Sequence, residues 1–441
     1  MDRAQWGSNL GFILAATGSA VGLGAIWKFP YVTAHQGSGA FLLLFTLLTL
    51  TIGLGLLRVE MTIGRAGNAG AFGAYRKLGG TGWGLVGLLG VLASATILSY
   101  YSVVGGWTIA YIWQTMTTAL TRDPDLLRAN FSALAEHPWL PLFYHALFML
   151  ATVGGVAGGV QGGIERISKV LMPCLFLMMC LLIVRGLMVP GAWAGVSAFL
   201  VPDFAGLTMQ SVLDALGLSF FTLSLALGIM TTYGSYLPAS ANLNRSALTV
   251  ALLTLLSCVM GGLLVLPPAY ALGLDQGAGP SLTFVTMPLV FSYLPWGNLF
   301  GTVFFTLLFI AALSSSISML EVVVAFLMEH AGQSRRAACA IAGIGLFLVG
   351  VLASLSMTGM PALQWGERNA FEWLDTIATN VMLPVGGLFT ALFAGWVIWH
   401  VLQKEWHGAP RQSALAAWRR LLIGLITPIA IGFILWNGLR G

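Results

Sequence analysis

The sequence has very little charge. Only 8% of its 441 residues are Asp, Glu, Lys or Arg, whereas 58% are hydrophobic. A soluble domain carries about a quarter charged residues, so this chain cannot surround a core with an ordinary aqueous surface. The shortage of charge excludes a water-soluble enzyme or nucleic-acid-binding domain and indicates a protein embedded in a membrane.

Cysteine is also scarce, and the patterns of common enzyme sites are missing. The four cysteines are Cys174, Cys180, Cys258 and Cys339. All four fall within apolar runs, where we expect them to be buried as small hydrophobic residues rather than joined in disulfides. The sequence has no HExxH motif, no phosphate-binding loop and no Cys/His metal-ligand spacing. We therefore expect a protein that is not an enzyme.

Apolar runs of about 20 residues or more, long enough to cross a bilayer as a helix, fill most of the chain. The alternating segments of about ten residues that mark outer-membrane barrels do not occur. The runs predict an all-α polytopic membrane protein with eleven spans. These are residues 10–34, 40–65, 84–118, 142–160, 167–188, 211–236, 245–272, 298–329, 336–357, 373–402 and 420–438.

Positive charge is distributed unevenly between the loops. Fourteen of the 20 Lys and Arg residues fall on the side of the predicted membrane that includes the N-terminus. Short cytoplasmic loops carry such an excess. We therefore expect a protein of the bacterial cytoplasmic (inner) membrane with its N-terminus inside and, because the span count is odd, its C-terminus outside.

Two spans contain small residues at mid-membrane depth. The first has the run GSAVGLG at 18–24, and the sixth has hydroxyl residues between Ser219 and Ser224, followed by Gly228. Glycine costs about 1 kcal/mol in a helix interior, and unwound backbone is tolerated in a bilayer only where it is buried in protein or lines a cavity. Close helix packing is the alternative explanation for either span alone.

The two interrupted spans are five apart, which is typical of transporters built from inverted repeats. We therefore predict a fold of five plus five helices in inverted repeats with an eleventh helix added. Helices 1 and 6 would be unwound at mid-membrane. The first repeat would cover residues 1–188, the second residues 211–402, and the additional span residues 420–438.

The breaks suggest binding chemistry. Freed carbonyl oxygens can bind a cation, and amides at the start of a half-helix can bind a carboxylate. Gly18 and Val21 are candidates for the first role, and Leu23 and Gly24 for the second. Uncharged hydroxyls that suit sodium occur at 314–316 in the eighth span, although serines there can equally bond their own helix.

Ionisable residues inside spans are rare and are expected to have partners. Lys28 and Asp375 lie toward the outer face and can form a salt bridge, although each can also extend separately to the interface. Glu60 and Glu321 lie deeper, as hydrogen-bonding groups or as protonation sites. Aromatic pairs at 100–101 and 220–221 either wall a pocket or pack the bundle.

Four long motifs resemble the neurotransmitter:sodium symporter family, in particular its bacterial amino-acid transporters with eleven spans. They are WGSNLGFILAATGSAVGLGAIWKFPY at 6–31, VEMTIGR at 59–65, SFFTLSLALGIMTTYGSY at 219–236 and AALSSSISMLEVVVAFL at 311–327. The resemblance implies a sodium site between the first and eighth spans. Its oxygens would be the carbonyls of Gly18, Val21 and Ala311 and the hydroxyls of Ser314 and Ser315.

The resemblance also implies that a second family sodium site is missing. That site takes amide side chains from the first and seventh spans, where this chain has Ala25 and Leu253, or Thr254 if the alignment shifts by one. We therefore expect one sodium ion per cycle. The position associated with chloride falls near Ser257, but without the neighbouring site we do not expect chloride dependence.

The implied substrate is a neutral, hydrophobic amino acid. Position 22 is glycine where monoamine-carrying relatives place an acid, which favours a substrate with its own carboxylate. The implied contacts of the carboxylate are Gly22, Leu23, Gly24 and Tyr101. The implied contacts of the amino group are Ala20, Phe221 and Thr222, with Ser224 nearby. The implied wall around the side chain is Ile97, Phe221, Ser224, Leu227 and Met319.

The resemblance further implies two gates and a hinge. Lys28 and Asp375 match the outer gate, with lysine where arginine is usual. The inner gate would comprise Arg3, Trp6, Tyr236 and Glu329. Gly163 and Pro173, separated by nine residues, resemble a motif at which relatives unwind the fifth helix.

Together these features predict sodium-coupled symport by alternating access, with a small-molecule substrate and the bilayer as the expected partners. One alternative is a proton-coupled or sodium-independent carrier on the same fold, with Glu60 or Glu321 titrating. A second alternative is a substrate-binding channel or nutrient sensor.

Overall fold

The computed structural model describes residues 4–274, 282–407 and 413–438, and these are almost entirely helical. Among them, nine helices are long and apolar enough to cross a membrane, and a pair bent by 50° at residues 21–23 makes ten. The nine are Gly39–Gly67, Thr81–Thr117, Leu140–Ala157, Val160–Leu187, Leu243–Ala271, Gly297–His330, Arg335–Ser356, Ala370–Val397 and Ala414–Asn437.

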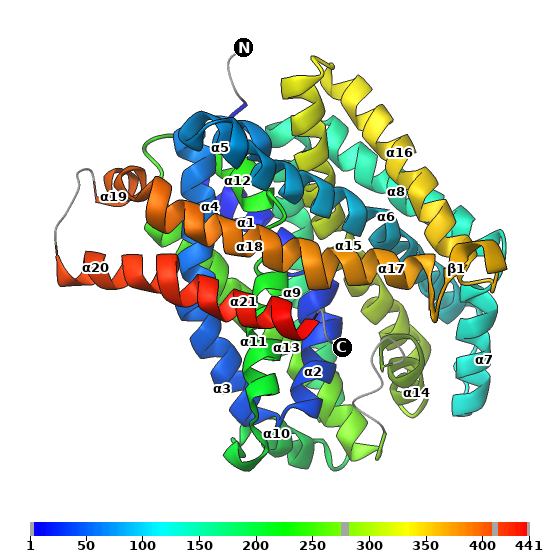
Figure 1. The fold of residues 1–441 in the computed structure, drawn as a ribbon. Helices are drawn as coiled ribbons and strands as arrows, with labels where there is room; N and C mark the ends of the chain where they lie inside the picture. The colour runs from blue at the N-terminus through cyan, green and yellow to red at the C-terminus, as the bar shows by residue number, and fades with distance from the viewer. Residues whose placement is uncertain (1–3, 275–281, 408–412, 439–441) are drawn as a thin grey trace.

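The helices that build the site keep the labels of Figure 1. In the first half of the chain they are α1 (Asn9–Ala20), α2 (Phe29–His35), α3 (Gly39–Leu48), α4 (Leu54–Gly67), α5 (Ala71–Gly79), α6 (Thr81–Thr117), α8 (Leu140–Ala157) and α9 (Arg166–Leu187). In the second half they are α11 (Met209–Thr222), α12 (Ile229–Gly234), α13 (Leu243–Ala271), α15 (Gly297–His330), α16 (Arg335–Ser356), α17 (Ala370–Thr376), α18 (Leu383–Leu392) and α21 (Thr427–Gly438). Short π-helical turns connect several of them, including Gly24–Lys28 before α2 and Val160–Glu165 before α9.

The sixth predicted span is two short helices rather than one. Residues 223–228 separate α11 from α12, so neither piece alone is long enough to cross a membrane. Ser224 and Ala226 have φ values of 54° and 63°, and Gly228 has 68°. Such values are unfavourable for residues other than glycine and end a right-handed helix. The chain is therefore interrupted in both the first and the sixth predicted spans. Unwinding at mid-membrane depth and the repeat boundaries 1–188 and 211–402 stay predictions.

The connections between the predicted spans contain further elements. These are α7 (Pro124–Ala135), α10 (Ala192–Leu200), α14 (Met287–Ser292) and a hairpin of β1 (Gln364–Trp365) with β2 (Arg368–Asn369). The remaining helices, α19 (Trp399–His407) and α20 (Ala414–Leu421), follow the tenth span and begin the last one.

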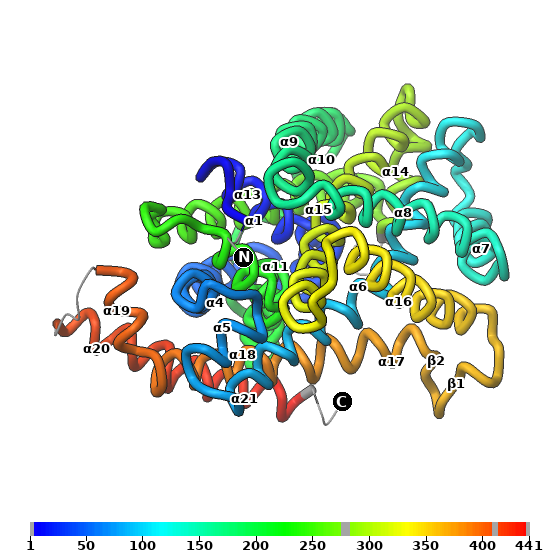
Figure 2. Tube along the Cα trace, turned by 90° about the horizontal axis from the view of Figure 1, so that it is seen from above, coloured from blue at the N-terminus to red at the C-terminus, as the bar shows by residue number. Residues whose placement is uncertain are grey.

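The interrupted helices occupy the middle of the bundle. Figure 2 shows α1 and α11 enclosed by other helices, with α9 on one side and α18 and α21 on the other. Helix α15 packs against both α1 and the long α6. Unwound backbone is thus surrounded by protein, which is where a bilayer tolerates it.

The expectation that all four cysteines are buried is wrong for two of them. Cys258 and Cys339 are buried, whereas Cys174 and Cys180 are exposed on α9. The apolar sequence around the cysteines predicted correctly that they lie on spans. However, a helix at the edge of a membrane bundle also exposes apolar residues on its outer face, as α9 does with Cys174 and Cys180. All four are free thiols.

Candidate functional site

A small cavity lies where the two interrupted helices meet. Its volume is about 30 Å³, enough for a water molecule. Its wall consists of Ser19, Ala20, Gly22, Leu23, Gly24, Ile97, Tyr101, Phe221, Ser224, Leu227, Ile229, Ser315 and Met319. The structure therefore brings together every residue predicted for substrate contact except Thr222, and none of these side chains is charged.

Hydrogen bonds tie the cavity wall together. Leu23 N–H donates to the hydroxyl of Tyr101 (3.2 Å), so an amide of the first break faces the third span. Ser224 Oγ donates to the Ser19 carbonyl (3.0 Å), which joins the two breaks directly. Thr222 instead donates to the Leu218 carbonyl (2.8 Å) within its own helix. Sequence reasoning missed Ser19 and Ile229, although both adjoin segments it had selected.

Neutral oxygens gather between the end of α1 and the middle of α15. Ser314 Oγ donates to the Gly18 carbonyl (2.7 Å) and the Ala311 carbonyl (3.0 Å). Ser315 Oγ donates to the carbonyls of Ser19 (2.9 Å) and Gly18 (3.4 Å). Both hydroxyls are buried, and Val21 is the residue that ends α1. Freed carbonyls with hydroxyls and no charged side chain form a donor set that fits an alkali cation.

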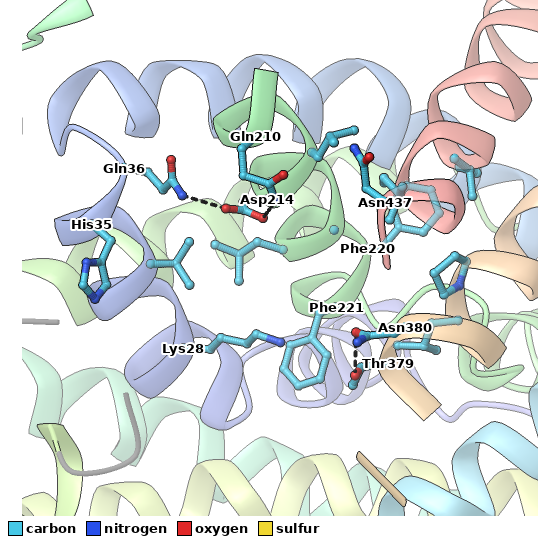
Figure 3. Close-up of a pocket in the computed structure, with 18 of the residues that line it drawn as sticks. Lys28, His35, Gln36, Gln210, Asp214, Phe220, Phe221, Thr379, Asn380 and Asn437 are labelled. Atoms are coloured by element: carbon cyan, nitrogen blue, oxygen red, sulfur yellow. Dashed lines mark hydrogen bonds between the residues drawn. The ribbon is translucent and has the colours of Figure 1, made fainter. Parts of the chain in front are cut away.

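A larger cavity of about 820 Å³ lies beyond the Phe221 ring, which lines both cavities. Figure 3 shows Lys28 pointing toward this ring, and its Nζ lies 4.8 Å from the ring centroid. On the other wall, the amides of Gln36 and Gln210 donate to the Asp214 carboxylate at 2.7 and 2.8 Å. Phe221 thus stands between a wide chamber and a small one.

The predicted pair of Lys28 and Asp375 is not in contact in this conformation. Among the ion pairs of the described residues, none joins them. Asp375 accepts a hydrogen bond from the Tyr100 hydroxyl (2.8 Å), while the Lys28 ammonium lies over the aromatic ring, an arrangement that attracts a cation. A lysine carries a single charged point on a flexible stem, so it reaches this ring without holding the carboxylate.

At the opposite end of the site, the N-terminal segment is bound to α12. Trp6 donates from its indole to the Tyr233 carbonyl (3.0 Å) and from its backbone to the Tyr236 carbonyl (3.1 Å). Glu329 accepts from the Gly70 amide (2.8 and 3.0 Å). Arg3, the predicted partner of Glu329, lies outside the described residues.

The predicted hinge of the fifth helix has irregular geometry. Gly159 has a φ of 82°, and the following π-helical turn, Val160–Glu165, contains Gly163. A methyl group on Gly163 would lie 2.3 Å from the Gly155 carbonyl oxygen, so only glycine fits there. Pro173 lies inside α9, where it lacks the amide that a regular helix needs.

Comparisons with known proteins agree with this geometry. The profile of the sodium:neurotransmitter symporter family matches residues 3–124 and 142–438. The chain belongs to this family. It is 39% identical over 437 residues to the sodium-dependent transporter YhdH of Bacillus subtilis, covering 98% of this chain and 97% of that one. It is 24% identical to the sodium- and chloride-dependent GABA transporter 2 of Bos taurus, over 90% of this chain and 73% of that one.

A solved structure has the same fold as this symporter. The crystal structure of MhsT in complex with L-phenylalanine superposes with a TM-score of 0.90 at 39% identity, covering 99% of this chain and 100% of that one. The family resemblance, the inverted-repeat transporter fold and the assignment as a transporter rather than an enzyme are therefore confirmed.

The symporter also has a buried contact that sequence reasoning missed. Glu165 at the end of the fifth-helix turn accepts hydrogen bonds from Gly7 N–H (2.7 Å) and Ser8 Oγ (2.8 Å), and Lys169 lies 2.7 Å from its carboxylate. Ser8 is the N-cap of α1. The hinge of the fifth helix is thereby fastened to the start of the first helix, a contact between residues about 157 positions apart.

We expect Glu165→Gln to loosen this fastening. The charge-assisted bonds that it weakens are worth about 1.5–3 kcal/mol each, so the thermal-unfolding midpoint of the purified protein should fall. Glu136→Gln is the matched control, because Glu136 is exposed and its replacement should leave the midpoint unchanged. Equal midpoints for the two variants would show that Glu165 does not hold the hinge.

Proposed function

We propose that this protein carries out sodium-coupled symport of a neutral, hydrophobic amino acid across the bacterial cytoplasmic membrane. The observation that carries the proposal is the meeting of the Ser314 and Ser315 hydroxyls with the carbonyls of Gly18 and Ser19 beside the small cavity. Sodium bound at those oxygens would tie α15 to the break in the first helix. The N-terminus would lie inside the cell and the C-terminus outside.

The character of the cavity supports the substrate class. Gly22 lies close to Tyr101 and Ser315, since a methyl group there would lie 3.0 and 2.3 Å from their oxygens. The substrate carboxylate would bind in the cavity beside them, next to the amides of Leu23 and Gly24. Ile97, Leu227 and Met319 would surround an apolar side chain. The similar structure of MhsT was solved in complex with L-phenylalanine, which is a neutral, hydrophobic amino acid.

One sodium site per chain is part of the proposal. A methyl group on Gly261 of α13 would lie 2.4 Å from the Ala25 carbonyl oxygen, so the seventh span packs closely against the place where relatives put a ligand. Thr254 is buried and donates to the Val250 carbonyl (2.9 Å) of its own helix. Leu253 has no ligand atom in its side chain. These observations support a single sodium site per chain.

The proposed cycle uses the contacts at both ends. Substrate enters through the 820 Å³ chamber. Phe221 and Lys28 then move toward Asp375, and this movement closes the site above the substrate. Loss of the contacts of Trp6 and Glu329, with unwinding near Gly163, opens the path below. Sodium favours one conformation only through its different affinity for the two, so the serines should govern both binding and conformation.

A screen of the twenty amino acids tests the proposal. Thermal shift of the purified full chain would be measured with each amino acid in sodium and in potassium chloride. We expect stabilisation by hydrophobic neutral amino acids in sodium alone, because ligands that bind the folded state raise its stability by mass action. Stabilisation that is equal in potassium would contradict sodium coupling. Stabilisation only by charged amino acids would contradict the substrate class.

A further inference from the structure

Glu60, on α4, is buried beside the break of the sixth span. Its side chain is 2% exposed, and Oε1 accepts a hydrogen bond from Ala226 N–H (2.6 Å). Ala226 is one of the positive-φ residues that end α11, so the carboxyl group stabilises the break itself. Helix α4 packs against α5, α12 and α18, and Figure 1 shows these four helices near one another.

The second oxygen, Oε2, has no hydrogen-bond partner within the described residues. Glu60 lines a small cavity of about 10 Å³ whose wall also includes Thr231, Tyr75 and Thr390. The Thr231 hydroxyl is likewise unpartnered, while the Tyr75 and Thr390 hydroxyls bond to each other at 2.7 Å. Tyr75 is the titratable group in this wall, whose other members are glycines and small or apolar residues. No described cation contacts the carboxyl group.

Glu321 provides an internal comparison. It is also fully buried, with 0% exposed, but Arg335 donates to both of its oxygens at 2.7 and 2.8 Å, and the Tyr236 hydroxyl adds a third bond (2.7 Å). Buried charges persist when they are paired and hydrogen-bonded. Glu321 meets this condition as a carboxylate and Glu60 does not.

We infer that Glu60 is a proton-binding site, holding a proton on Oε2 while the break of the sixth span has this geometry. An unpaired buried carboxylate costs several kcal/mol, and such a group neutralises instead. As a neutral acid, Glu60 still accepts from Ala226 N–H through Oε1, while the O–H on Oε2 donates to one water molecule in the small cavity. That water would also bond the Thr231 hydroxyl, so both unpartnered groups would be satisfied.

The proton site is coupled to the substrate cavity through the chain. Ala226 immediately precedes Leu227, which lines that cavity, and Ser94 Oγ fixes the Leu227 carbonyl at 2.6 Å. If the break rearranges during the cycle and water reaches Glu60, the acid releases its proton to that water and becomes a carboxylate. A proton is thus a second ion that this chain can bind, in addition to the sodium of the proposed function.

Infrared spectroscopy of the purified full chain tests this inference. A buried neutral acid gives a carbonyl-stretching band that a carboxylate lacks. We expect such a band at neutral pH, lost in Glu60→Gln and retained in the control Glu136→Gln, whose side chain is exposed. Absence of the band from the parent protein, or its persistence in Glu60→Gln, would overturn the inference.

Thr231→Val gives a second measurement that keeps Glu60 in place. It removes the hydroxyl that shares the cavity with Oε2, so the acid band should move to a different frequency without disappearing. An unmoved band would contradict the placement of the proton. The amino-acid screen in sodium is independent of both spectra, so failure of the symport proposal and failure of the proton site give different results.

Discussion

Replacing Ser314 and Ser315 together by alanine should abolish the sodium dependence of substrate binding. Each hydroxyl meets a carbonyl of the first break, at 2.7 Å from Gly18 and 2.9 Å from Ser19. Hydrogen bonds to charged groups are worth about 1.5–3 kcal/mol, and we assume that a lost cation ligand is comparable. Removing both hydroxyl ligands should therefore weaken sodium binding by about 10²-fold or more. Titrating sodium in the thermal-shift assay at saturating amino acid measures this change.

Ser316→Ala is the matched control for that experiment. Ser316 follows directly on the same helix and is equally buried, but its hydroxyl bonds to the Leu313 carbonyl (2.9 Å) and to Thr152 (2.8 Å), away from the first span. Its removal should leave sodium affinity unchanged. If Ser316→Ala weakened sodium binding as strongly as the double variant, the effect would reflect packing of α15 and the proposed site would be wrong.

Gly22→Ala should impair sodium and substrate binding together. The added methyl group would lie 2.3 Å from Ser315 Oγ and 3.0 Å from the Tyr101 hydroxyl. Ser315 cannot move away freely, because it is buried and bonded to Ser19. Overpacking of this kind costs about 1–3 kcal/mol, or about 10–100-fold in affinity. Uptake of the amino acid identified by the screen, measured in proteoliposomes against sodium concentration, would show both losses.

The control for this variant is Gly345→Ala on α16. A methyl group there meets nothing within 4 Å, and alanine is the better helix former. Uptake by Gly345→Ala should equal that of the parent protein. Normal uptake by Gly22→Ala would show that the close approach of Gly22 to Ser315 and Tyr101 is not needed for binding.

The predicted spans agree with the observed helices because the thickness of the bilayer limits the length of each apolar run. The eighth span, predicted at 298–329, is Gly297–His330, and the first, predicted at 10–34, is the bent pair from Asn9 to His35. The two interruptions could also be predicted from the sequence, because glycine and hydroxyl residues weaken a helix wherever they occur. Helix α5 and the β1–β2 hairpin were not predicted, because neither is long enough to give a span signal.

Much of the candidate site could be predicted because the ordered motifs carry it. Ala20, Leu23, Tyr101 and Met319 were selected from the sequence and lie around one cavity. Their predicted roles in binding stay predictions. The contact of Glu165 with Ser8 was not predicted, since nothing in a local pattern says which buried carboxylate lies against which helix start.

By itself, the sequence determined the membrane-spanning class, the positions of the helices and their two interruptions, because hydrophobic length and backbone propensity are local properties. The tertiary structure alone decided how the charged groups are paired. It places Lys28 on Phe221 rather than on Asp375, and it gives Glu321 an arginine but leaves Glu60 without a cation within the described residues. Such differences depend on distances of a few ångströms between segments far apart in the chain. Only the packing of the whole bundle sets those distances.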